Sequence, residues 1–277
     1  MSLKNLEVSK RVLTQALNKA RDLSVPLFIG GDLRDTKAII RGEEINMLNT
    51  LFSENNDVRV LLMVGNHDLM NKNSDAHSLE FLRHHSNITI IDGPLVLDTE
   101  GGIGRFYCIP YKKTKEEFQE EIKRAKELGF TRILGHQGVQ GAKMGDYVVD
   151  ESSICPKELE SFEFIGLGHY HKSQDLGNVR YWGSPFTVNF GESSDRKCFW
   201  VVNEDDNNKI QLEPIPTDVR HHRQMVVLEG YKSHEDWPDY NEGDPIKVIL
   251  KGAKEFALRS HEKQFKKLYP NNPITFV

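Results

Sequence analysis

The stretch Met63-Val64-Gly65-Asn66-His67-Asp68 ends an apolar run with a glycine and three consecutive polar side chains. The asparagine offers a neutral oxygen, the histidine can donate a proton or stabilise charge, and the aspartate can orient that histidine. The same form recurs at Gly31-Asp32, Gly135-His136 and Gly168-His169-Tyr170-His171. Because each cluster follows a run that reads as a strand, the sequence predicts strands whose ends share one site.

Each of the three other clusters also has an ordinary structural explanation when it is taken alone. Asp32 fits a turn or a helix N-cap, and a single histidine after a strand, such as His136, is more often structural. His169 and His171 are two residues apart, so in extended backbone their side chains point to the same side. Imidazole nitrogens with carboxylate and amide oxygens suit Mn²⁺, Fe or Zn²⁺. In this order, the four clusters together indicate a metal-dependent phosphoesterase.

Composition limits the class of protein. The chain has 277 residues, of which 38% are hydrophobic and 28% charged, and its net charge is −5. This balance argues against a strongly basic nucleic-acid binder, although bound divalent ions can offset the carboxylates of a nuclease. No apolar run approaches the roughly 18 residues that cross a bilayer, and residues 1–10 lack a signal-peptide core. The odd, widely spaced Cys108, Cys155 and Cys198 fit a reducing compartment, so we expect a cytoplasmic protein without a membrane partner.

Helical and strand-like patterns alternate along most of the chain. Helical patterns are expected at residues 6–20, 43–52 and 114–128, and strands at 25–29, 58–64, 88–91, 95–97, 106–109, 131–134 and 162–167. Thr114 and Glu117 form a capping-box signature, and Gly129 predicts the end of that helix. Residues 179–212 have the pattern of antiparallel strands. The sequence thus predicts an α/β fold over residues 1–220.

Residues 221–277 predict a second, smaller α+β domain. Strands are expected at 225–228 and 246–250, and a helix at 254–268. A segment of about fifty residues is short for an independent core.

The remaining histidines lie among polar residues, and we expect them to be solvated: His77, His84, His85, His221, His222, His234 and His261. The basic run Lys263, Lys266 and Lys267 predicts a solvated helix face rather than a DNA site.

The four clusters resemble the second to fifth motifs of the calcineurin-like metallophosphoesterases. Within that superfamily, residues 178–186 (Asn-Val-Arg-Tyr-Trp-Gly-Ser-Pro-Phe) and Phe190-Gly191-Glu192 are similar to SbcD-type DNA repair nucleases and phage recombination nuclease subunits. Ile109-Pro110-Tyr111 is also similar to its counterpart there. The resemblance covers about residues 5–220 and implies a four-layer sandwich of two mixed β-sheets flanked by helices. Residues 221–277 resemble the start of a DNA-capping domain.

The resemblance implies a pair of metal sites. Asp32 would bridge the two ions, and Asn66, His136 and His169 would complete one site. His171 would belong to the other site. Manganese is the usual activator in this family.

The resemblance also implies the reaction and its partners. Metal-activated water would hydrolyse a DNA phosphodiester, with the two ions steadying the attacking and leaving oxygens. His67 would stabilise the pentacoordinate phosphate or protonate the leaving oxygen, and Asp68 would hold His67. The full-length protein would bind an SbcC-type coiled-coil ATPase, with a homodimer as a further expectation.

The sequence departs from the family pattern in two places. The family opens with a strand that ends in Asp-x-His and supplies two ligands to the His171 site, whereas this sequence begins within the helix that follows. We therefore expect an N-terminally truncated domain with one nearly complete metal site and one that keeps only Asp32 and His171. Arg34 stands where the family usually has phenylalanine.

Three functions remain open on the sequence. The first is a DNA exonuclease or endonuclease subunit of an SbcCD-like repair or recombination complex, which the segment from Tyr181 to Pro185 favours. The second is a phosphatase or a cyclic-nucleotide phosphodiesterase on the same fold. The third is a catalytically impaired pseudo-nuclease, which the absent first motif favours and the intact His67 and Asp68 oppose.

Overall fold

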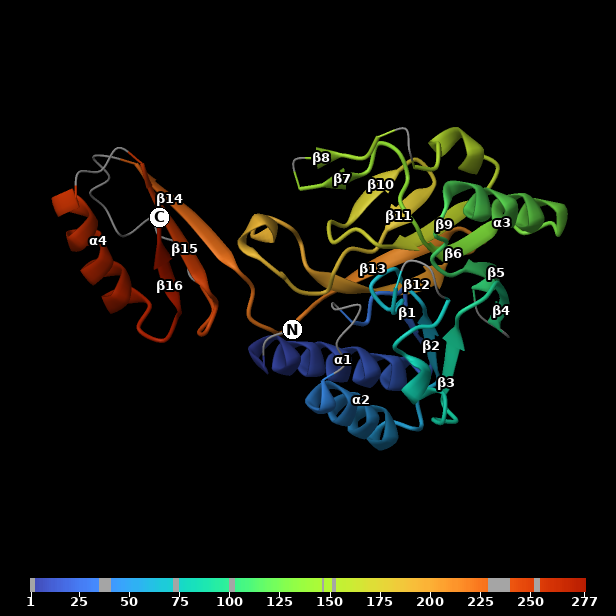
Figure 1. Ribbon diagram of the computed structural model, residues 1–277, viewed down its shortest axis with the longest axis horizontal. Coiled ribbons are helices and arrows are strands. Elements are labelled where there is room, and N and C mark those ends of the chain that lie inside the picture. Colours follow the sequence, from blue (N-terminus) through green and yellow to red (C-terminus); the bar gives the residue numbers. More distant parts are fainter. Residues whose placement is uncertain are drawn as a thin grey trace. The chain divides into compact units, whose positions relative to one another are not determined.

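Short apolar strands build two sheets in the first of the two units into which the chain divides (Figure 1). The structure is a computed structural model that describes residues 3–34, 41–71, 75–99, 103–145, 147–150, 153–228, 240–251 and 255–277, without the side chains of residues 3–5, 228 and 255–260. The first unit comprises Met1–Pro185 and Lys197–Thr217, and the second comprises Phe186–Arg196 and Asp218–Val277.

The first sheet has the order β1-β2-β3, and its strands run parallel. Its strands are β1 (Leu27–Ile29), β2 (Val60–Met63) and β3 (Ile88–Ile91), and the helices before β1 and β2 are α1 (Leu3–Leu23) and α2 (Gly42–Glu54). A parallel connection needs a crossover of a dozen or more residues, which α2 and its flanking loops supply between β1 and β2.

The second sheet has the order β10-β11-β9-β6-β5-β4 and mixed strand directions. Its central strands β5, β6, β9 and β11 are parallel, and the edge strands β4 and β10 are antiparallel to their neighbours. The bounds are β4 (Leu95–Thr99), β5 (Gly104–Ile109), α3 (Lys115–Glu127), β6 (Arg132–His136), β9 (Phe164–Gly168), β10 (Gln174–Leu176) and β11 (Val179–Tyr181).

Smaller elements complete the description. They are the hairpins β7 (Lys143–Met144) with β8 (Tyr147–Val148) and β12 (Cys198–Glu204) with β13 (Ile210–Pro216), and the 3₁₀ turns η1 (Glu80–Leu82), η2 (Pro156–Leu159) and η3 (Phe190–Glu192). Among the described helices, none combines the length and apolar character needed to span a membrane.

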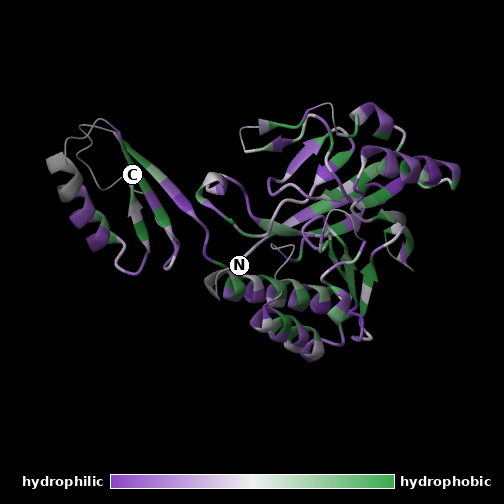
Figure 2. Cartoon of the chain, in the orientation of Figure 1, coloured by the Kyte–Doolittle hydropathy of each residue, from purple (hydrophilic) through white to green (hydrophobic). Residues whose placement is uncertain are grey.

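The core lies in three apolar layers, because alternate residues of a strand face opposite sides of its sheet. In β2, Val60 and Leu62 belong to the cluster under α1 and α2, whereas Leu61 and Met63 belong to the cluster between the two sheets. Helix α3 covers the outer face of the second sheet through its buried Phe118. In Figure 2, these helices carry both hydrophilic and hydrophobic residues. The order helix, sheet, sheet, helix confirms the predicted four-layer α/β sandwich.

The second unit has its own small core. Strands β14 (Arg223–Leu228), β15 (Ile246–Lys251) and β16 (Ile274–Phe276) form a parallel sheet, and α4 (Glu255–Leu268) connects the last two. Residues 186–196 belong to this unit, since Thr187 Oγ1 accepts a hydrogen bond of 2.6 Å from the His222 backbone N–H. The sequence placed the boundary after residue 220; the first unit ends at Thr217, and the earlier segment was not foreseen.

Two histidines that were expected to be solvated are buried. His85 is 8% exposed, its Nε2 lies 3.0 Å from Asn49 Oδ1, and burial lowers its pKa. His77 is also 8% exposed, and its Nε2 lies 3.4 Å from Asp92 Oδ2. The polarity of residues nearby in the sequence does not predict which residues surround a side chain in the folded structure, and this explains the error. His84, Lys263, Lys266 and Lys267 are exposed as predicted, and His234 lies outside the described residues.

The predicted capping box at the start of α3 is confirmed. Thr114 Oγ1 accepts a hydrogen bond of 3.2 Å from Glu117 N–H, and Glu117 Oε2 accepts one of 3.3 Å from Thr114 N–H. Replacing Thr114 by alanine removes the hydroxyl oxygen and leaves Glu117 N–H without this acceptor, so the free energy of unfolding should fall by about 1 kcal/mol. Urea denaturation measures this loss. Thr50→Ala, at an exposed position inside α2, is the control and should cost nothing. Equal losses in the two variants would contradict the role of the box.

Candidate metal centre

The predicted polar clusters lie at the carboxyl ends of parallel strands from both sheets. Asp32 follows β1, the Gly65-Asn66-His67-Asp68 turn follows β2, His136 ends β6, and His169 follows β9. Strands β6 and β9 are neighbours in the second sheet, with His136 beside Gly168. Because ligands of α/β proteins gather where parallel strands end, this edge is the expected place for a site.

The two sheets come into direct backbone contact at this edge. A Cβ atom placed on Gly168 would lie 2.0 Å from the Gly30 carbonyl oxygen and 2.7 Å from His136 Nδ1. No side chain fits in that space, so glycine before His169 is a requirement of packing between the sheets. The close approach brings the end of β1, in one sheet, against the ends of β6 and β9 in the other.

His136 is the centre of the site. Its ring is fully buried, and its Nδ1 lies 2.7 Å from the Gly30 carbonyl oxygen. A carbonyl oxygen only accepts, so Nδ1 carries the proton and Nε2 of the neutral ring keeps its lone pair. Nε2 lies 3.2 Å from Asp32 Oδ2 and 3.1 Å from Asn66 Oδ1.

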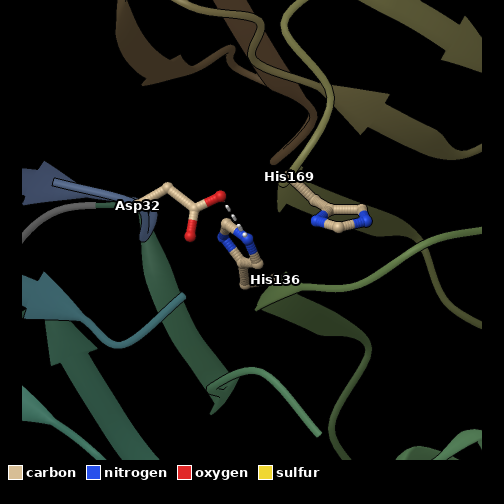
Figure 3. A group of neighbouring side chains, drawn as sticks. All are labelled: Asp32, His136 and His169. Atoms are coloured by element: carbon tan, nitrogen blue, oxygen red, sulfur yellow. Dashed lines mark ion pairs between the residues drawn. The ribbon is translucent and has the colours of Figure 1, made fainter. Parts of the chain in front are cut away.

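His169 approaches the same point from the other side. Its Nδ1 lies 2.8 Å from Asn66 Oδ1, and one ligand atom from each of Asp32, His136 and His169 lies within 4.8 Å of the other two. Figure 3 shows the Asp32 carboxylate facing the His136 ring, with the His169 ring nearby. Four side chains predicted from sequence as one ligand set are therefore neighbours.

The donor set fits a divalent transition ion. Asp32 Oδ2, Asn66 Oδ1 and Nε2 of neutral His136 are all hydrogen-bond acceptors that face one another. None of these three atoms carries a proton that it could donate to the other two. A cation among them satisfies all three, and the mixture of imidazole, carboxylate and amide oxygen is the set that Mn²⁺, Fe and Zn²⁺ accept.

Electrostatics in the site favour a cation. Burial by itself raises the pKa of Asp32, but the His136 charge and the hydrogen bonds from His136 and from His67 N–H outweigh it, so this pKa lies below its usual value. Burial by itself lowers the pKa of His136, but Asp32 outweighs it, so this pKa lies above its usual value. Burial, helped by the His136 charge, lowers the pKa of His169 to about 4.

Asp68 joins the two loops of the first sheet. Its carboxylate accepts hydrogen bonds of 2.8 Å from Asp32 N–H, 2.8 Å from Gly65 N–H and 3.2 Å from Arg34 N–H. Its side chain is fully buried, and burial, followed by the negative charge of Asp32, raises its pKa to about 7. These contacts fix Asp32 against the Asn66 turn, while the predicted role of Asp68 in holding His67 stays a prediction.

His67 and His171, which were also predicted for the site, are more exposed than His136. His67 is half-buried, and its backbone N–H donates to Asp32 Oδ1 at 2.7 Å. His171 is exposed and does not belong to the group formed by Asp32, His136 and His169. The described residues thus assemble the first predicted ligand set and leave the assignment of His171 to a second set untested.

Two residues near the site were not assigned a role from the sequence. The Tyr111 ring stacks on His169 with 6.3 Å between centroids and meets His136 edge-on at 6.2 Å. The resemblance around Ile109-Pro110-Tyr111 was the only sequence signal for it. Arg34 is fully buried and forms an ion pair with Glu44, with 3.0 Å between Arg34 Nε and Glu44 Oε1. A lone arginine in a sequence gives no sign of such burial.

A second group of potential ligands has a different explanation. His77, Glu80 and Asp92 also offer atoms within 4.8 Å of one another. Arg83 already forms ion pairs with both carboxylates, with contacts of 2.7 Å to Glu80 Oε1 and 2.6 Å to Asp92 Oδ2. This cluster is an ion-pair network at the surface.

Comparisons with known proteins bear on this geometry. No protein-family model matches the chain. Exonuclease subunit 1 of Enterobacteria phage T4 is 25% identical over 233 residues, which are 82% of this chain and 66% of that protein. DNA double-strand break repair protein Mre11 of Methanocaldococcus jannaschii is 26% identical over 179 residues, which are 60% of this chain and 47% of that protein.

The chain is a homologue of the SbcD-type, calcineurin-like nucleases. The resemblance seen in the sequence is thereby confirmed. The chain spans 66% of the length of the phage relative and 47% of the length of Mre11.

The metal affinity of this site should depend on pH through His136. The raised pKa of His136 means that a proton occupies Nε2 at mildly acidic pH, whereas His169, with a pKa of about 4, is already neutral. A metal ion must displace the His136 proton, so Mn²⁺ affinity should fall by about tenfold for each pH unit below that pKa. Asp68, whose pKa is about 7, changes the affinity in the same direction. Calorimetry in buffers of different ionisation enthalpy measures affinity and proton release together, and an unchanged affinity from pH 8 to pH 5.5 would contradict this account.

Proposed function

We propose that this chain is the nuclease part of a DNA repair or recombination nuclease, and that it hydrolyses DNA phosphodiesters with a divalent metal ion. The observation that carries the proposal is the meeting of Asp32, Asn66 and His169 around His136 Nε2 at the strand ends. The names of the two relatives, an exonuclease subunit and a double-strand break repair protein, support DNA as the proposed substrate.

Asp32, Asn66, His136 and His169 are the proposed metal ligands. A divalent ion held there supplies Lewis-acid polarisation of a phosphate oxygen and lowers the pKa of water. We favour Mn²⁺, since the ligand set mixes two imidazoles with one carboxylate and one amide oxygen. The full burial of His136 leaves the half-buried His169, Asn66 and Asp32 as the side from which substrate approaches.

His67 is the proposed catalytic residue beside the metal ligands. Its backbone N–H holds Asp32 Oδ1 at 2.7 Å, so the residue is fixed to the ligand that carries the negative charge of the site. From a half-buried position the imidazole can donate a proton to a leaving oxygen or stabilise charge that develops on phosphate. Asp68, buried behind it, keeps the turn in place and is proposed to orient the ring.

The assembly around this chain is part of the proposal. The word "subunit" in the name of the phage relative supports a partner protein, which we propose to be an SbcC-type coiled-coil ATPase bound by the full-length protein. A homodimer and a cytoplasmic location, in the host cell if the protein is encoded by a phage, complete this proposal. Residues 221–277 are proposed as part of a DNA-capping domain.

A catalytically impaired nuclease is the second candidate, and one observation favours it. The described residues gather one ligand set, and the exposed His171 is not in it. A single ion lacks the symmetric clamp on attacking and leaving oxygens that a pair of ions provides. Metal stoichiometry and DNA cleavage, measured on the same preparation, separate the two candidates.

Substitution of His67 should separate chemistry from metal binding. His67→Gln removes a proton donor, so Mn²⁺-dependent cleavage of linear DNA should fall by about 100-fold or more while metal affinity stays within a few-fold. Asp32→Asn should lose both, because it removes the charged ligand. Gel-based cleavage of linear, circular and single-stranded DNA with calorimetric Mn²⁺ titration gives both quantities.

The control for these variants is His84→Gln, at an exposed histidine. It should leave cleavage and metal affinity unchanged. The small diester bis-p-nitrophenyl phosphate and the monoester p-nitrophenyl phosphate test the phosphatase and phosphodiesterase alternative. Rapid turnover of these esters with no DNA cleavage would overturn the nuclease proposal, and tight binding of one ion with neither activity would establish the impaired nuclease.

A further inference from the structure

The loop that carries His169 and His171 has an unusual backbone. His169 has φ of +92°, a conformation that side chains other than glycine rarely adopt. Such a conformation costs on the order of 1–3 kcal/mol and persists only where the surroundings hold it in place. The orientation of the His169 ring toward Asn66 depends on this backbone, so the contacts that hold the loop also hold the ring.

Three hydrogen bonds converge on one carbonyl group of this loop. The His171 carbonyl oxygen accepts from Ser184 N–H at 2.9 Å, from Ser184 Oγ–H at 3.4 Å and from Lys197 Nζ at 3.0 Å. His171 contributes to the centre through its backbone, whatever its imidazole does. A carbonyl held by three donors has little freedom to rotate, so the peptide plane two residues after His169 is fixed.

The segment around Ser184 is shaped for this contact. Gly183 has φ of +77°, and a Cβ atom there would lie 2.8 Å from Ser173 N and 3.1 Å from the His171 carbonyl oxygen. Any other residue at position 183 would push the two segments apart. The Gly183-Ser184 pair, which was the most distinctive part of the sequence resemblance, therefore packs directly on the metal-binding loop.

Lys197 also takes part in this contact. Its side chain is buried, with the residue 7% exposed, and Nζ donates to Ser184 Oγ at 2.8 Å as well as to the His171 carbonyl oxygen. Burying an ammonium group is costly unless hydrogen bonds compensate for the water it loses. The hydrogen bonds to the His171 carbonyl oxygen and to Ser184 Oγ offset part of this cost and link Lys197 to the loop.

We propose that Lys197, acting with Ser184, is a positioning residue that fixes the His169–His171 loop so that His169 Nδ1 faces Asn66 in the metal centre. The proposal rests on the proposed metal centre. Lys197 touches neither the ligand atoms nor a substrate; it acts through the His171 carbonyl group and the backbone that leads to His169. Outer contacts of this kind typically change metal affinity by about 10–100-fold when they are removed.

The test is Mn²⁺ affinity, measured by calorimetric titration of the whole chain. Lys197→Met keeps the length and removes the donors, and Ser184→Ala removes the bridging hydroxyl with little change in volume. We expect affinity to fall about 10–100-fold in Lys197→Met and less in Ser184→Ala, with the double variant no worse than Lys197→Met. Lys197→Arg, which restores a buried donor, should recover part of the affinity. Electron paramagnetic resonance of bound Mn²⁺ should also change in Lys197→Met, because His169 is displaced.

Arg132→Met is the matched control for a purely structural effect. Arg132 is also 7% exposed and pairs with Glu163 and Glu204, but it begins β6 at the end opposite His136. It should lower thermal stability without changing Mn²⁺ affinity below its unfolding temperature. If Lys197→Met does not fold, Ser184→Ala carries the test alone.

The outcomes separate the two proposals. Failure of the unsubstituted chain to bind Mn²⁺ overturns the metal centre and, with it, this inference. Tight binding by the unsubstituted chain with the same affinity in Lys197→Met, or in Ser184→Ala where that variant stands alone, overturns the positioning role and leaves the metal centre intact. A loss of affinity in Arg132→Met as large as in Lys197→Met also overturns the positioning role.

Discussion

The contact between the Gly30 carbonyl group and the His136 ring is the constraint on which the site depends. Gly30 directly follows β1 of the first sheet, and His136 ends β6 of the second. Their hydrogen bond of 2.7 Å selects the His136 tautomer and joins the sheets at the same time. Gly168 makes the contact possible, since a Cβ atom there would lie 2.0 Å from the Gly30 oxygen. The close approach of the two sheet edges therefore determines both the position and the protonation of the central ligand.

Two polar contacts hold the loops that leave this edge, one in each sheet. In the first sheet, Asp68 accepts hydrogen bonds from Asp32 N–H and Gly65 N–H. In the second, the His171 carbonyl group receives donors from Ser184 and Lys197. Both contacts use a buried charged residue on backbone groups, which costs desolvation energy and gives a fixed geometry in return. The proposed metal centre is assembled from four strand ends, so a change in position at one of them would remove one proposed ligand.

The electrostatic character of the centre follows from this packing. Burial alone raises the pKa of Asp32 and lowers the pKa of His136. The interaction between the two residues outweighs burial in both, so the pKa of Asp32 lies below its usual value and the pKa of His136 lies above its usual value. His169 and Asp68, which are buried beside them, are driven toward their neutral forms, with pKa values of about 4 and about 7. A divalent ion held by these residues would take the place of the His136 proton and would be bound by the acceptor atoms that face one another there. The site is thus polarised by the fold in the direction that favours cations.

The sequence by itself determined most of the helices and the longer strands and the identity of the clustered side chains, and its resemblance to a known family implied the layers. The continuous apolar run of β2 and the Thr114-Glu117 box are local signals, and glycines followed by metal-type ligands mark strand ends. Each of these signals lies in residues that are neighbours in the sequence. The tertiary structure alone decided which groups meet. The burial of His77 and His85, the stacking of Tyr111 on His169, and the reach of Lys197 to the His171 carbonyl group join residues far apart in the chain. Local sequence fixes backbone preference and polarity, but distances between segments depend on packing between sheets, which no single segment contains.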